Sequence, residues 1–135
     1  GVATVLSLNP TIDVLMAPGR YQAEEGALQG SQTLSFLENL RADWAVLGAS
    51  GLTKEGVADA MIESAEVYAA MSRRAAQTMV VADNSKFHKI AHARYAIWNK
   101  IDVLVTDQQP SGDLARAVRA SGTRVLTGPV SVLPS

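Results

Sequence analysis

The sequence contains no cysteine. This absence excludes a disulfide framework, a zinc site built on thiolates and thiol catalysis, and it fits a reducing compartment. Long hydrophobic runs are also missing, since no apolar segment approaches the ~18 residues that a membrane-spanning helix needs. The opening residues do not have the layout of a signal peptide. We therefore expect a cytoplasmic protein that does not engage a membrane.

An excess of charge of one sign is lacking as well. The chain has 12 Lys and Arg residues and 13 Asp and Glu residues, which gives a formal net charge of −1. The basic residues are scattered and do not form the stripe that nucleic-acid-binding surfaces usually carry. If the protein regulates DNA, its DNA-contacting part lies outside this chain. A glycine-rich phosphate loop and a dinucleotide-binding fingerprint are absent too, and we expect no cofactor.

The composition that remains is that of one globular domain. Of the 135 residues, 47% are hydrophobic and 19% are charged, which suits one core and is too little for two ordinary domains. We expect an α/β domain over residues 1–128 and a loose C-terminal tail over residues 129–135. Because Gly1 leads straight into an apolar segment without an initiator Met, we expect the chain to begin inside a larger protein.

Short apolar runs bounded by polar or small residues predict alternating strands and helices. Strands are expected at residues 12–16, 44–47, 79–82, 102–105 and 123–126. Helices are expected at residues 31–40, 64–76, 89–99 and 111–120, with loops at 19–30 and 52–62. The strand runs are continuously apolar, which indicates that both faces of the sheet are covered. The predicted fold is α/β, an open, mainly parallel sheet with right-handed connections and helices on both faces.

The expected strand ends carry the candidate site, because ligands of open parallel sheets bind beyond the carboxyl ends of the strands. Small residues, hydroxyls and a cation at these ends suit an anionic, polyhydroxylated ligand. We predict an effector site formed by Gly48, Ala49, Ser50, Gly51, Asp83, Ser85 and Lys86, with Arg20 as a weaker candidate. Simpler interpretations remain open: residues 48–51 as a tight turn, Asp83 as a helix cap and Arg20 as a surface residue.

Two histidines and two tryptophans allow other interpretations. His88 and His92 are four residues apart on an expected helix, a spacing that can hold zinc, but the sequence offers no obvious third ligand. We therefore expect no metal site. No basic residues interleave with Trp44 and Trp98, so we assign both to the core and not to base stacking.

Four segments, in order and spacing, resemble the C-terminal effector-sensing domain of DeoR-family transcriptional repressors. They are Gly48-Ala49-x-Gly51 after a strand, Ala65-Glu66-Val67-x-x-x-Met71, Asp83-x-Ser85-Lys86-Phe87 after a strand, and Ile101-Asp102-x-x-Val105-Thr106-Asp107. The resemblance runs from Val2 to about Gly128. Within the family the chain looks most like the glycerol-3-phosphate-type repressors.

The resemblance implies a fold like that of ribose-5-phosphate isomerase and CoA transferases, incomplete at its N-terminus, in which residues 2–8 end a helix. It also implies a phosphorylated sugar or glycerol-phosphate-type effector, self-association as dimers or tetramers, and DNA binding only through an N-terminal helix-turn-helix domain missing from this chain. Two departures from the family pattern matter. Ser50 replaces an acidic residue of the kind that the related isomerases use for proton transfer, which argues against an enzyme. Tyr68 replaces a lysine, and we regard it as a weaker effector contact. The alternatives are a sugar-phosphate isomerase-like enzyme and a non-binding oligomerisation domain.

Overall fold

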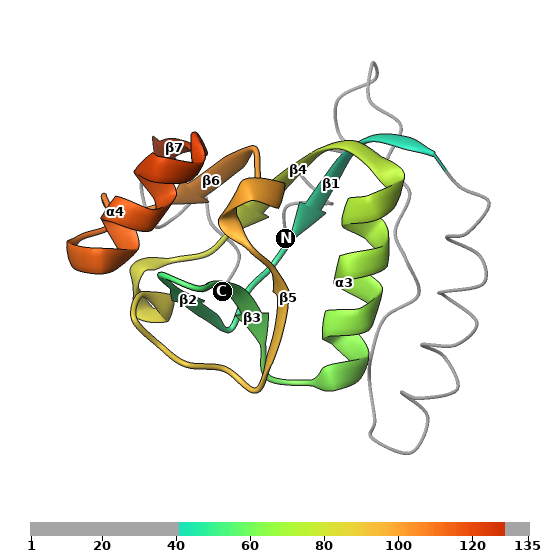
Figure 1. Ribbon diagram of the computed structural model, residues 1–135, viewed down its shortest axis with the longest axis horizontal. Coiled ribbons are helices and arrows are strands. Elements are labelled where there is room, and N and C mark those ends of the chain that lie inside the picture. The colour runs from blue at the N-terminus through green and yellow to red at the C-terminus, as the bar shows by residue number, and fades with distance from the viewer. Residues whose placement is uncertain (1–40, 129–135) are drawn as a thin grey trace.

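The computed structural model describes residues 41–128 (Figure 1). Its elements, in chain order, are β1 (Ala42–Leu47), β2 (Gly51–Thr53), β3 (Gly56–Asp59), α3 (Ile62–Arg74), β4 (Ala75–Val81), η1 (Asn84–Lys86), β5 (Ala93–Ala96), η2 (Trp98–Lys100), β6 (Val103–Thr106), α4 (Gly112–Ser121) and β7 (Arg124–Thr127). The expectations for residues 1–40, which include Arg20, and for the tail at 129–135 lie outside the described residues.

Within residues 41–128 the main sheet has four strands in the order β1-β4-β6-β7, and every pair among them is parallel. This confirms the parallel α/β prediction, and each of the four strands overlaps one of the expected apolar runs. In the register, Leu47 lies beside Val80, Val80 beside Leu104, and Leu104 beside Val125. The register therefore places these side chains in one row on one face of the sheet.

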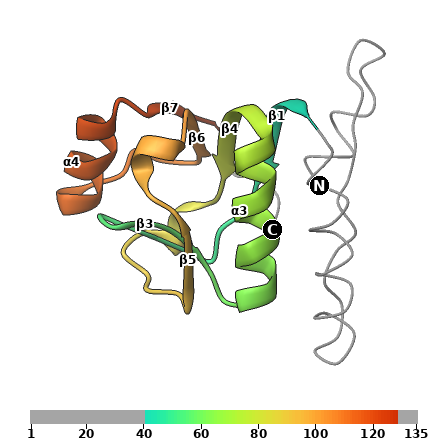
Figure 2. The ribbon, with the colours of Figure 1, turned by 45° about the vertical axis from the view of Figure 1, so that its right-hand side comes forward.

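The described core lies on that face of the sheet. It combines side chains of the sheet with residues of both helices and of η2, among them Leu47, Leu104, Ala65, Trp98 and Leu114. Figures 1 and 2 show α3 beside β1 and β4, and α4 at the other end of the sheet near β6 and β7. No helix within residues 41–128 is both long and apolar enough to cross a membrane.

The two helices that the structure describes, α3 and α4, begin and end close to where the sequence predicts. α3 has Glu63 in its first turn and Arg73 and Arg74 in its last turn, which complements the helix dipole. α4 ends at Gly122, whose φ of 80° lies in the left-handed region that favours glycine. Ser111 occupies the N-cap position of α4, but its side chain makes no capping hydrogen bond.

A second, antiparallel sheet in the order β2-β3-β5 corrects two predictions. The expected loop at 52–62 contains most of a β-hairpin and the start of α3, and the expected helix at 89–99 contains β5. β2 and β3 are very short, and every residue of β3 is buried, so neither strand has an alternating pattern to detect. β5 is rich in alanine, but its backbone pairs with β3, and this tertiary pairing overrides helix propensity.

Candidate functional site

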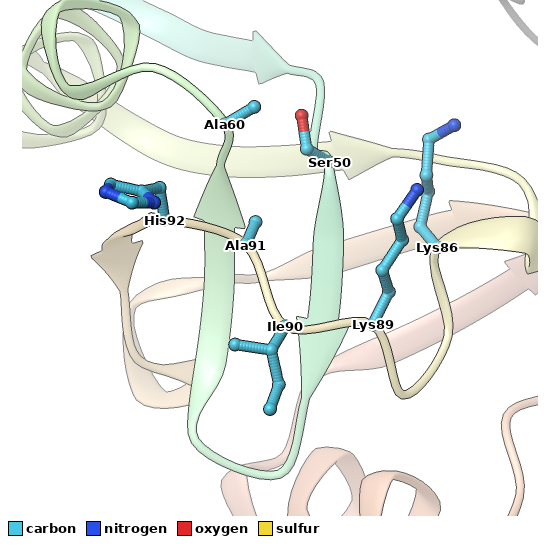
Figure 3. Close-up of a pocket in the computed structure, with 7 residues that line it drawn as sticks. All are labelled: Ser50, Ala60, Lys86, Lys89, Ile90, Ala91 and His92. Atoms are coloured by element: carbon cyan, nitrogen blue, oxygen red, sulfur yellow. The ribbon is translucent and has the colours of Figure 1, made fainter.

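Three segments meet around one cavity near the carboxyl ends of β1 and β4. Its volume is about 350 Å³, and it is lined by Ser50, Ala60, Lys86, Lys89, Ile90, Ala91 and His92. Figure 3 shows the Ser50 hydroxyl and the side chains of Lys86 and Lys89 extending toward the same side, with Ala60 next to Ser50. The cavity is a surface depression, because Lys89, Ile90 and His92 are exposed.

The turn that carries Ser50 is held from two sides. The Ser50 backbone N–H donates to the carbonyl of Ala58 in β3, at 2.9 Å. The Tyr95 hydroxyl, which belongs to β5, donates to the carbonyl of Gly48, at 2.6 Å. Burial raises the pKa of Tyr95 well above its ordinary value, and the nearby Tyr68 and Asp59 raise it further. The small antiparallel sheet therefore fixes the backbone that follows β1.

Asp59 lies directly behind Ser50 and is a residue that sequence reasoning missed. Its side chain ends β3 and is only 3% exposed. One carboxylate oxygen accepts the Ser50 hydroxyl at 3.3 Å, and the other accepts the backbone N–H of Met61 at 3.0 Å. Because residues 52–62 are predicted to be a loop, Asp59 is not predicted to be a buried carboxylate next to the site. An aspartate that ends a short apolar run just before a helix is the signal that could have revealed it.

The turn after β4 holds Lys86. Asp83 caps η1 by accepting the backbone N–H of Ser85 at 2.8 Å, and it also accepts the Ser85 hydroxyl. The Lys86 ammonium lies 3.9 Å from the Asp83 carboxylate and donates to the Ser85 hydroxyl at 3.3 Å. The side-chain bond from Ser85, then its backbone bond, and then the charge of Lys86 lower the pKa of Asp83. Asp83 is thus both the cap of η1 and the partner that orients Lys86.

The same turn is tied to the end of β6. The Asp107 carboxylate accepts the backbone N–H and the side-chain N–H of Asn84, each at 2.8 Å. Two neighbouring strand ends are therefore linked, although neither Asp107 nor Asn84 lines the cavity.

The segment from Lys89 to His92 supplies the cavity residues that the sequence did not predict. Leu52 and Phe87 form an isolated parallel bridge, and the His88 N–H donates to the carbonyl of Leu52 at 2.8 Å, which ties the segment to β2. Because the sequence predicts a helix at 89–99, it does not predict this extended segment. A carboxylate lies within 4 Å of the Lys86 ammonium but, among the described residues, none lies that close to the Lys89 ammonium.

The two histidines do not share a helix, which corrects the prediction that placed them on one. His88 has a φ of 59° and points toward the start of α4, with Nδ1 3.7 Å from Asp113 and Nε2 3.5 Å from the Ser111 hydroxyl. His92 lines the cavity instead. No group of three or more His, Asp or Glu side chains within residues 41–128 is placed to hold a metal ion.

The predicted site residues that the structure describes fall into four groups. Ser50 and Lys86 line the cavity, whereas Asp83 and Ser85 hold Lys86 from outside it. The other members of the turn at 48–51 do not line the cavity: the Gly48 carbonyl accepts from Tyr95, the Ala49 side chain packs on the core, and Gly51 lies under the segment at Lys89. Tyr68 packs edge to face on Tyr95, with ring centroids 5.3 Å apart, and is not among the lining residues.

The chain is similar in sequence to known proteins of one family. The chain is similar to a family model described as the DeoR C terminal sensor domain, which matches residues 1–108. It is also similar to the HTH-type transcriptional repressor GlcR of Bacillus subtilis, at 30% identity over 125 residues, covering 93% of this chain and 48% of that protein.

Two glycerol-3-phosphate regulon repressors are similar as well. The protein from Haemophilus influenzae is 31% identical over 111 residues, covering 82% of this chain and 43% of the relative. The protein from Escherichia coli is 26% identical over 110 residues, covering 81% and 44%. The chain thus spans about half the length of the relatives it matches.

Proposed function

Because the chain belongs to the DeoR C-terminal sensor domain family, we propose that it is the effector-binding part of a cytoplasmic transcriptional regulator. Its effector is a small phosphorylated sugar or a glycerol-phosphate-type metabolite, and it binds in the cavity lined by Ser50, Lys86 and Lys89. Two of the relatives are named as glycerol-3-phosphate regulon repressors, which supports this class of ligand.

One observation carries the proposal: two lysine ammonium groups and a serine hydroxyl line the same small cavity. Lys86 is oriented by Asp83 and Ser85, and the Lys89 ammonium has no described carboxylate within 4 Å to neutralise it. A phosphate group at neutral pH carries one to two negative charges and only strong acceptors, so two ammonium groups suit it. The cavity volume, about 350 Å³, lies in the range of small-molecule sites.

The proposal is binding without turnover. Proton transfer on a sugar phosphate needs a base within hydrogen-bond reach of the carbon-bound proton. The described lining residues include no carboxylate, since Asp59 lies behind Ser50, although His92 offers an imidazole there. The proposal of binding without turnover therefore rests on the family of the chain. The names of the relatives as repressors agree with a sensor. An effector that only binds must favour one of two conformations, and that preference is what it transmits to a DNA-binding domain.

The test uses the full-length protein and a thermal-shift series with glycerol 3-phosphate, glucose 6-phosphate and ribose 5-phosphate. We expect at least one of them to raise Tm, because a ligand that binds only the folded state stabilises it. Lys86→Ala and Lys89→Ala should each abolish most of the rise while leaving the unliganded Tm close to wild type. Lys100→Ala is the matched control, because this lysine is also exposed but ends η2 and does not line the cavity.

Two results would overturn the proposal. One is the absence of a shift with every phosphorylated compound in the wild-type protein. The other is a shift that both lysine variants keep at full size. Conversion of ribose 5-phosphate to another pentose phosphate by the purified protein would favour the isomerase alternative.

A further inference from the structure

The direction of one hydrogen bond divides the cavity into two chemically different ends. The Ser50 hydroxyl donates to the Asp59 carboxylate, because an ionised carboxylate only accepts. With its proton committed to Asp59, the Ser50 oxygen presents its remaining lone pairs elsewhere. Ser50 is therefore prepared to accept a hydrogen bond from a ligand, and less prepared to donate one.

A phosphate group does not match the Ser50 oxygen, because its oxygens are chiefly acceptors. A ligand hydroxyl does match it, since a hydroxyl can donate. The Ser50 hydroxyl keeps its bond to Asp59, at 3.3 Å, while its oxygen accepts from the ligand. The complementary groups for phosphate are the ammonium groups of Lys86 and Lys89, which line the same cavity (Figure 3).

Capping of the chain before α3 does not by itself explain a carboxylate at Asp59. The oxygen that accepts the Met61 N–H would be supplied equally well by the amide oxygen of asparagine. The second oxygen faces Ser50, and a charged side chain that is only 3% exposed is costly to bury unless it is well paired. The carboxylate thus offers Ser50 an oxygen that can only accept, which makes the Ser50 hydroxyl the donor.

We propose that Asp59, acting through Ser50, makes this cavity select phosphorylated compounds that carry free hydroxyl groups over equally charged compounds without them. This inference rests on the proposed function, because it assumes that the lysines hold the phosphate. Ser50 contacts a ligand hydroxyl, and Asp59 is the positioning residue that fixes the direction of the Ser50 proton.

The experiment is isothermal titration calorimetry on the full-length protein with two matched pairs of ligands. Glycerol 3-phosphate is compared with n-propyl phosphate, and ribose 5-phosphate with n-pentyl phosphate, so that each pair shares its carbon number and its phosphate. We expect the wild type to bind the hydroxylated member of at least one pair about tenfold more tightly, the size of one to two net hydrogen bonds. Ser50→Ala and Asp59→Asn should reduce that ratio to near one, chiefly by weakening the binding of the hydroxylated member.

The ratio separates a selective role from a merely structural one, because loosening of the cavity weakens both members of a pair. Ser50→Thr keeps a hydroxyl and should restore the preference that Ser50→Ala loses. If Asp59→Asn does not fold, Ser50→Ala decides the question alone. A folded Ser50→Ala protein with the wild-type ratio overturns this inference and leaves the lysine site standing. Equal binding of both members of each pair by the wild type also overturns this inference and leaves the lysine site standing. Failure of the wild type to bind any of the four phosphates overturns the proposed function together with the inference.

Discussion

The backbone carbonyl of Lys89 lies directly against the α-carbon of Gly51, in the place where a Cβ atom would be. β2 begins at Gly51, and Lys89 lies on the segment that forms one wall of the cavity. Any other residue at Gly51 would overlap the backbone of that segment, and backbone cannot move aside as easily as a flexible side chain. Glycine at this position is therefore what lets the Lys89 segment approach β2.

We predict that Gly51→Ala destabilises the protein by about 1–3 kcal/mol, as overpacking usually does, and weakens effector binding because the Lys89 segment is displaced. Gly48→Ala is the matched control, since a Cβ there meets no described atom within 4 Å. Denaturant unfolding and calorimetry compare the two variants. Equal effects of the two alanines would contradict the role given to Gly51.

Asp107 should support both the stability of the protein and effector binding, although it does not line the cavity. We expect Asp107→Ala to cost about 1 kcal/mol of stability and to weaken effector binding, because the two bonds to Asn84 hold the turn that carries Lys86. Asp43→Ala, a substitution of an exposed aspartate near the start of β1, should change neither quantity. If Asp107→Ala keeps the wild-type affinity for the effector, the bonds between Asp107 and Asn84 do not support the site.

The pKa of Asp83 gives a prediction with a definite sign. Hydrogen bonds from Ser85 lower this pKa, with a further contribution from the charge of Lys86. The stability that the carboxylate contributes is fully present above the ordinary aspartate value of about 3.9, and it is lost as the pH falls through the lower pKa of the folded protein. A carbon-13 NMR titration should place Asp83 below its ordinary value in the wild type and closer to it in Ser85→Ala. An unchanged pKa in that variant would contradict the assignment of Ser85 as the main cause.

Tyr95 provides the corresponding test at high pH. Burial, followed by Tyr68 and Asp59, raises its pKa in the folded protein. The stability that depends on the neutral phenol is complete below the ordinary tyrosine value of about 10 and is lost as the pH rises through the raised one. Tyr95→Phe removes the bond to the Gly48 carbonyl and should cost about 1–2 kcal/mol near neutral pH. Above pH 10 that cost should shrink. A difference in melting temperature between wild type and Tyr95→Phe that stays constant up to pH 11 would contradict the raised pKa of Tyr95.

Much of the fold follows from the sequence because each main-sheet strand contains a short apolar run with a clear end. β4 and β6 are bounded by polar residues that begin at Asp83 and Asp107, and α4 ends at a left-handed glycine, Gly122. These signals are local, so a single sequence contains them. The same strand ends made Ser50 and Lys86 candidates for the site.

The small sheet could not be predicted in the same way, because its stability comes from pairing between distant segments. β5 pairs with β3, which lies more than 30 residues earlier, and its alanine-rich sequence favours a helix in isolation. The clue in the sequence is the glycine at position 56, and the structure explains it: the φ of Gly56 is 139°, and a Cβ there would overlap the carbonyl of Ala96. Without that sheet, Lys89 and His92 could not be placed at the cavity, nor Asp59 behind Ser50.

The most direct test of the central claim is a crystal structure of the full-length protein with the phosphorylated compound that gives the largest thermal shift. We predict phosphate oxygens within hydrogen-bond distance of the Lys86 and Lys89 ammonium groups and a ligand hydroxyl against Ser50. A phosphate bound elsewhere on the protein, with both lysines still in solvent, would contradict it.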